Sequence, residues 1–152
     1  MKKLMDKLGA YVSNRKVLYY FLNFTWGIFL TFIGYLLMII LLPFGKIRKY
    51  NYILYLEFNR KTGWGFSMGT VFFVGNKANR YTKQHEFGHT VQNAILGPLM
   101  IFLVAIPSVI RFWYRRFLFS IKKTPKGHYD DIWFEGNASQ IGLNYFLKSN
   151  NN

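Results

Sequence analysis

The sequence contains no cysteine, and in 152 positions it has only six acidic residues, four prolines and three histidines. Without cysteine, the chain has no disulfide, no thiolate metal site and no cysteine nucleophile. Lysine and arginine together number 20, which gives a net charge of +14. Any metal site must therefore be built from the few histidines and carboxylates that are present.

Charged residues are also absent from positions 17–42, where the chain reads VLYYFLNFTWGIFLTFIGYLLMIILL. About 20 apolar residues are enough for a helix to cross the hydrocarbon core of a bilayer. Pro43 and Gly45 end this segment, and lysines and arginines flank it on both sides, as is typical of membrane-anchored helices. The pattern predicts a transmembrane helix over 17–42.

The basic residues flank apolar segments instead of alternating with polar ones. This arrangement favours contact with anionic lipid head groups, and we expect membrane lipids and no nucleic acid as partners. Residues 1–16, MKKLMDKLGAYVSNRK, are too polar for a cleaved signal peptide. They have apolar residues at helical spacing among lysines, which predicts a basic interfacial segment. The alternative for this segment is a solvated tail.

Two aromatic and β-branched segments, 50–58 and 66–75, indicate β-strands, with turn residues at 59–65 between them. We expect them to pair as a short antiparallel β-hairpin. The hairpin either covers the core or offers an edge strand to which an extended peptide adds; the sequence does not decide between these.

The apolar segment that follows a predicted helix over 81–96 is interrupted by Gly97-Pro98 and again by Pro107. The piece between the prolines is too short to cross a bilayer. After it, the basic and aromatic segment RFWYRRFLFSIKK is typical of a helix that lies on an interface. We therefore expect a broken or re-entrant apolar helical hairpin, followed by a turn over 124–131 and a last helix over 132–148.

The most informative stretch is YTKQHEFGHTVQ, which contains the pattern H-E-x-x-H. On a helix, His85 and His89 are four residues apart and project from one face toward a single point. Two neutral imidazoles suit Zn²⁺, and Glu86 between them can act as general base toward a zinc-activated water. The plain alternative is a pair of surface histidines beside a glutamate.

Catalytic zinc usually has three protein ligands, so one more is needed. Glu135 is favoured because the last helix also carries the small Ala138 one turn later, which allows it to approach the motif helix closely. Of the other donors, Glu57 lies in a predicted strand, and His128, Asp130 and Asp131 in the predicted turn remain open as alternatives. His128, or Tyr129 beside it, is also a candidate to stabilise an oxyanion. Gln92 is a candidate for positioning a ligand.

The segments HEFGH (His85 to His89) and EGNA (Glu135 to Ala138) resemble the gluzincin metallopeptidases, and especially their membrane-embedded branch. In that branch the H-E-x-x-H helix leads into apolar segments, and a later helix returns with E-x-x-A. The resemblance implies that His85, His89 and Glu135 are zinc ligands and that Glu86 is the general base. The family commonly has an aspartate four residues after the ligand glutamate, where this chain has Ser139.

The sequence thus predicts an α+β membrane protein in which residues 43–152 form a membrane-associated zinc metallopeptidase domain whose C-terminal helix bears the third ligand. The expected function is hydrolysis of peptide bonds near the membrane surface, with one Zn²⁺ per chain and a peptide or a membrane protein as substrate. The expected location is a bacterial inner membrane, with the site at the interface on the cytoplasmic side. The alternative is a non-catalytic membrane protein with a structural zinc site and a basic face for lipid or a partner. The sequence indicates no oligomeric state.

Overall fold

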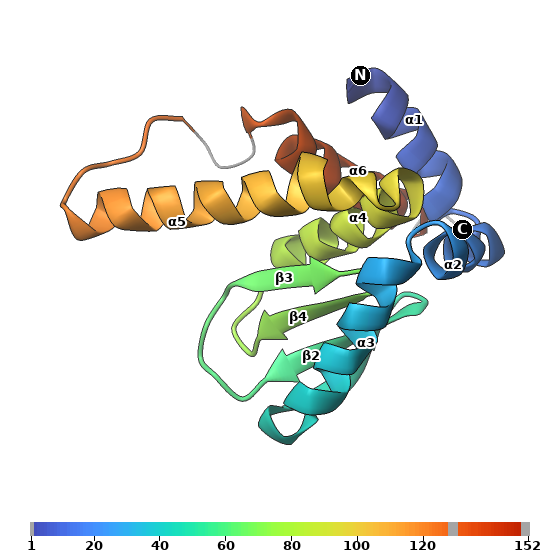
Figure 1. The fold of residues 1–152 in the computed structure, drawn as a ribbon, viewed down its shortest axis with the longest axis horizontal. Helices are drawn as coiled ribbons and strands as arrows, with labels where there is room; N and C mark the ends of the chain where they lie inside the picture. The colour runs from blue at the N-terminus through green and yellow to red at the C-terminus, as the bar shows by residue number, and fades with distance from the viewer. Residues whose placement is uncertain (1, 128–130, 150–152) are drawn as a thin grey trace.

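A mixed β-sheet of four strands has helices packed on both of its faces (Figure 1). The computed structural model describes residues 2–127 and 131–149, and within these residues it has six α-helices. The strands lie in the order β1-β2-β4-β3 across the sheet. Their bounds are Gly45–Tyr50 for β1, Ile53–Phe58 for β2, Gly65–Met68 for β3 and Val71–Gly75 for β4.

The sheet is made of two tight hairpins, so the predicted antiparallel pairing of 50–58 with 66–75 is wrong. Asn51 (φ 54°) and Gly69 (φ 61°) each begin a two-residue turn, a connection that requires the left-handed region. Gly69 therefore reverses the chain inside a segment that was predicted as one strand. As a result β2 and β4 become neighbours that run parallel, with Tyr55 opposite Phe72.

Side chains of β4 alternate between the two faces of the sheet, because a strand has a period of two residues. Phe72 and Val74 pack into the cluster that contains Phe87 of α4 (Arg80–Leu96). Val71 and Phe73 pack on the other face against Met38 of α3 (Ile28–Leu41). All five residues of β4 are buried. The sheet thus holds α4, the helix that carries H-E-x-x-H, in a fixed place.

The apolar segment 17–42 forms two helices instead of one. Helix α2 (Lys16–Thr25) is followed by a break at 26–27, by α3 and by the short 3₁₀ turn η1 (Leu42–Phe44). Among the described residues, no single helix is long and apolar enough to cross a membrane. The one pair that has the length and composition together bends by 94° at this break. The predicted transmembrane helix and the predicted integral-membrane localisation are therefore wrong.

The break between α2 and α3 is fixed by polar contacts with α4. The side-chain amide of Asn93 donates to Asn23 Oδ1 at 2.6 Å and to the carbonyl of Gly27 at 3.3 Å. A Cβ at Gly27 would lie 2.5 Å from the amide nitrogen of Asn93, so only glycine allows this approach. A count of apolar residues does not detect these buried asparagines.

The predicted re-entrant hairpin is also wrong. Gly97 (φ 55°) ends α4, and the chain then continues through the π-helical turn η2 (Ile101–Ala105) directly into α5 (Ile106–Ser120). Pro107 lies in the first turn of α5, where its missing N–H is tolerated, and the wider π turn before it relieves the crowding that a proline causes. Figure 1 shows α5 extending away from the sheet, and none of its residues is buried.

Helices α1 (Lys2–Ser13) and α6 (Trp133–Ser149) pack against α4 and against each other. Two glycines allow α4 and α6 to approach closely. A Cβ at Gly88 would lie 2.0 Å from the carbonyl oxygen of Ala138, and a Cβ at Gly142 would lie 2.1 Å from that of Gln84. This close approach brings the start of α6 to the H-E-x-x-H face of α4.

Replacing Gly142 with alanine should therefore destabilise the protein, although alanine is the better helix former. The added methyl group collides with backbone, which cannot move aside as a flexible side chain can, and overpacking of this kind costs about 1–3 kcal/mol. Thermal unfolding of the metal-free protein measures the effect. Gly63→Ala is the control, because its nearest neighbour would be at 3.6 Å, and equal melting temperatures for the two variants would contradict the prediction.

Candidate metal centre

His85, His89 and Glu135 form a cluster whose geometry can hold a metal ion. The cap at Asn79, whose side chain accepts from the backbone N–H of Thr82 at 2.9 Å, begins helix α4. Positions 85 and 89 then lie on one face of that helix, and Glu135 comes from the first turn of α6. His85 Nε2, His89 Nε2 and Glu135 Oε2 each lie 3.1 Å from the other two atoms.

These distances fit a zinc ion. Zinc in a tetrahedral site has bonds of about 2.0–2.2 Å to nitrogen and oxygen, which places neighbouring ligand atoms roughly 3.3–3.5 Å apart. The triangle of 3.1 Å edges needs only a small expansion to reach that geometry. The donor set of two imidazoles and one carboxylate also suits zinc, with a fourth position left for water.

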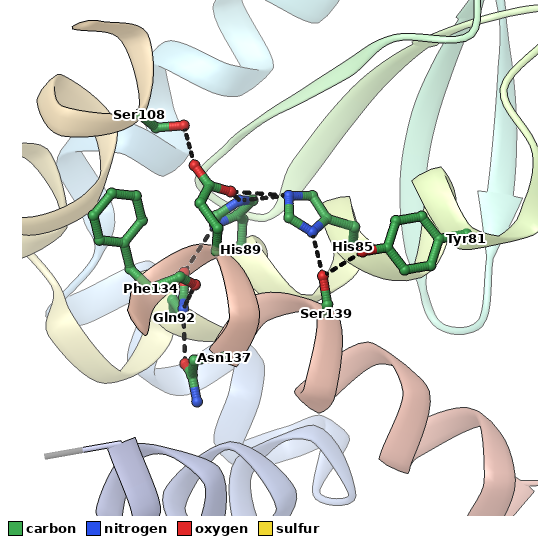
Figure 2. A network of polar contacts seen from close by, with 9 residues as sticks. Tyr81, His85, His89, Gln92, Ser108, Phe134, Asn137 and Ser139 are labelled. Carbon is green, nitrogen blue, oxygen red and sulfur yellow. Dashed lines mark hydrogen bonds and ion pairs between the residues drawn. The ribbon is translucent and has the colours of Figure 1, made fainter. Parts of the chain in front are cut away.

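Gln92 fixes the proton on His89. The amide Nε2 of Gln92 donates to the backbone carbonyl of Phe134 at 2.8 Å, and a carbonyl can only accept. The other amide atom, Oε1, is therefore the acceptor that lies 2.8 Å from His89 Nδ1. His89 must carry a proton on Nδ1, which turns the lone pair of a neutral ring at Nε2 toward the cluster (Figure 2).

Ser139 supports His85 in a similar way. Its hydroxyl lies 2.8 Å from His85 Nδ1 and 3.0 Å from the hydroxyl of Tyr81 (Figure 2). When Nδ1 donates to Ser139, Nε2 keeps its lone pair for a metal. Ser139 stands where gluzincins commonly have aspartate, and its hydroxyl contacts His85 without bringing a charge.

Glu135 is completely buried (0% exposed). Burial raises the pKa of this carboxyl, but the hydrogen bonds with His85 and His89 outweigh burial and hold the pKa well below its ordinary value. Its second oxygen, Oε1, accepts from the hydroxyl of Ser108 at 2.5 Å. Burial lowers the pKa of His89, but Glu135 outweighs it and the net pKa is raised. A metal that binds there consequently displaces a proton.

Glu86 is buried beside the cluster, between α4 and the edge strand β3. A Cβ at Gly65 of β3 would lie 3.0 Å from Glu86 Oε1, so the strand runs directly against this carboxylate. Burial raises the pKa of Glu86 above its ordinary value, although His89 and His85 oppose the rise. A carboxyl with a raised pKa holds a proton more strongly, which is what a general base needs.

The remaining predicted donors do not join the cluster. Glu57 lies on β2 and pairs with Arg48 at 3.3 Å and Lys83 at 3.5 Å. The one metal-binding group found among the described residues does not include Asp131. His128, the predicted oxyanion residue and alternative ligand, lies outside the described residues together with Tyr129 and Asp130.

Ser108 and Asp6 both take part in hydrogen bonds around the metal centre, and neither was predicted from the sequence. Ser108 lies near the start of α5, in an apolar segment that was expected to belong to a broken or re-entrant hairpin. Asp6 accepts a hydrogen bond from Asn137 at 2.7 Å and lies in an N-terminal segment that was expected to be interfacial. The only sequence signal for Asp6 is that it is the single acidic residue among the first 56 positions.

Comparison of the chain with protein-family models, with curated proteins and with solved structures finds no match. The likeness to gluzincins therefore rests on the residues of HEFGH and EGNA and on the cluster that they form.

Proposed function

We propose that this chain is a zinc metallopeptidase of gluzincin type. In this proposal His85, His89 and Glu135 hold one Zn²⁺, and Glu86 is the general base. The observation that carries the proposal is the triangle of three ligand atoms, 3.1 Å apart, beside the buried carboxylate of Glu86, which is not one of the three ligands.

In this proposal the metal and each residue of the site have a separate role. Zinc, when bound, supplies a Lewis acid that polarises a carbonyl and lowers the pKa of water. Glu86 accepts a proton from the attacking water and delivers it to the leaving amine. Gln92 keeps His89 in the tautomer that presents its Nε2 lone pair, and Ser139 can accept from Nδ1 of His85 in the matching tautomer. Ser108 holds the ligand carboxylate in place.

A peptide is the favoured substrate class because of strand β3. In the order β1-β2-β4-β3 this strand lies at the edge of the sheet, and its Gly65 packs on Glu86. An extended peptide that adds to such an edge forms backbone hydrogen bonds along its length. Its backbone would then pass next to the general base.

A structural zinc site is the second candidate, and the burial of the ligands favours it. The side chains of His85, His89 and Glu135 are 12%, 8% and 0% exposed, and structural zinc sites are closed to solvent. A structural site has no use for a carboxylate such as Glu86, so the two candidates differ in whether the protein hydrolyses peptides.

Removal and return of the metal tests the proposal. The purified protein should contain about one zinc per chain by elemental analysis, as expected for one three-ligand site. It should cleave peptides from a fluorogenic library, lose that activity on dialysis against a chelator, and regain it when zinc is added. Zinc without cleavage would favour the structural site, and cleavage that survives removal of all metal would contradict the proposal.

A further inference from the structure

A continuous chain of hydrogen bonds leads from α1 to the metal centre. Asn137 donates through Nδ2 to Asp6 Oδ1 at 2.7 Å, and Gln92 donates through Nε2 to Asn137 Oδ1 at 2.7 Å. Gln92 Oε1 lies 2.8 Å from Nδ1 of His89. The carboxylate of Asp6 is thus linked to His89, a predicted zinc ligand, through the side-chain amides of Asn137 and Gln92.

The direction of every bond in this chain is determined. A carboxylate without its proton can only accept, so Asn137 must turn its NH₂ toward Asp6 and its oxygen toward Gln92. Gln92 must then donate to Asn137, as its bond to the Phe134 carbonyl also requires. Each N–H points away from the metal centre and toward Asp6, and each step polarises the next.

The residues of this chain are held firmly. Gln92 and Asn137 are both fully buried (0% exposed). On α1, Met5 and Val12 are buried, and a Cβ at Gly9 would lie 2.5 Å from Ile141 of α6. Helix α1 is therefore docked on α6 through closely packed residues, and Asp6 is held at a fixed place.

We propose that Asp6 is a positioning residue for the metal centre. Its negative charge, transmitted through Asn137 and Gln92, makes His89 a more basic zinc ligand, as a carboxylate bonded directly to a zinc histidine does in other sites. This role rests on the proposed zinc function. The charge matters because Ser139 brings none to His85 and because the chain as a whole is strongly basic, with a net charge of +14.

Asp6→Asn separates this role from simple packing. Asparagine has the shape of aspartate, and its carbonyl can still accept from Asn137, so a packing role predicts no change. A charge role predicts weaker zinc binding, by roughly tenfold, the lower end of the effect of losing a directly bonded partner. Glu57→Gln is the matched control, because it removes one negative charge outside the cluster.

The double variant Asp6→Asn with Asn137→Asp tests the direction of the chain. The new carboxylate at 137 can accept from both Gln92 and the amide at position 6, so the chain stays intact and the charge moves one residue closer to His89. This variant should bind zinc at least as tightly as the wild type. It also shows whether any loss of zinc affinity in Asp6→Asn comes from misfolding.

The experiment is a zinc competition titration against a chromophoric chelator, together with the visible spectrum of the Co²⁺-substituted protein and the melting temperature of the metal-free form. Support is a Kd raised about tenfold in Asp6→Asn alone, a changed Co²⁺ spectrum, an unchanged melting temperature and recovery in the double variant. Equal Kd values for wild type and Asp6→Asn overturn the inference about Asp6 but leave the proposed zinc function standing. Equal weakening in Asp6→Asn and Glu57→Gln overturns it as well, because the effect would then be one of net charge. A wild type that binds no zinc overturns both the inference and the proposed function.

Discussion

Glu86→Gln should abolish most peptide hydrolysis while leaving zinc bound. Glutamine has nearly the same size as glutamate but cannot accept a proton from water, and loss of a general base costs about 10²- to 10⁴-fold in rate. Zinc should remain, because Glu86 is not part of the three-residue metal-binding group. The measurements are kcat/KM on the best peptide substrate and zinc content per chain.

Two results would contradict this prediction. Unchanged kcat/KM would show that Glu86 is not the base, and loss of zinc together with activity would show that it is needed to build the site. Glu57→Gln is the control, since it makes the same chemical change on a carboxylate that is paired with Arg48 and Lys83 away from the cluster. It should retain both zinc and activity.

The core of the site was predictable because it depends on local geometry. Two histidines four residues apart lie on one helical face whatever surrounds the helix. Glu135 followed from the scarcity of other donors and from the small Ala138 beside it, and the structure brings it within 3.1 Å of both imidazoles. The motif also contains Gly88, whose lack of a side chain is what lets α6 approach.

The residues that support the ligands through hydrogen bonds were harder to predict from the sequence. Ser108 and Asp6 reach the site only because α5 starts beside α6 and α1 packs on it. Neither residue has a spacing relative to H-E-x-x-H that marks it. Gln92 was the exception, because at three residues beyond His89 it lies close to the same helical face.

The fold prediction was wrong where composition was used without tertiary contacts. Residues 17–42 have the composition of a membrane span, but Asn23 and Gly27 meet Asn93 of α4, and the helix breaks there. The sheet prediction was wrong for a similar reason. One residue with positive φ, Gly69, turned a predicted strand into a hairpin, and the parallel pairing of β2 with β4 depends on long-range contacts that no local pattern records.

Glu135→Ala should remove zinc almost completely, in contrast to Ser108→Ala. The first variant deletes one of three ligands, and the fall in zinc affinity should exceed the roughly 10- to 100-fold loss that follows removal of a group hydrogen-bonded to a ligand. Ser108→Ala removes such a group, because it bonds Oε1 of Glu135 and leaves Oε2 facing both histidines. The fall in zinc affinity of Ser108→Ala should therefore stay within roughly 10- to 100-fold. Elemental analysis and a zinc competition titration measure both variants.

Zinc at the wild-type level in Glu135→Ala would contradict the three-ligand site described above. The third ligand would then be sought in His128 or in the pair Asp130 and Asp131, which shortly precede α6 in the chain. Absence of zinc from the wild type as well as the variant, after purification in zinc-containing buffer, would instead remove the basis for a metallopeptidase. Comparable losses in the two variants would mean that the hydroxyl of Ser108 is as necessary as the ligand it holds, and α5 would then be part of the metal centre itself.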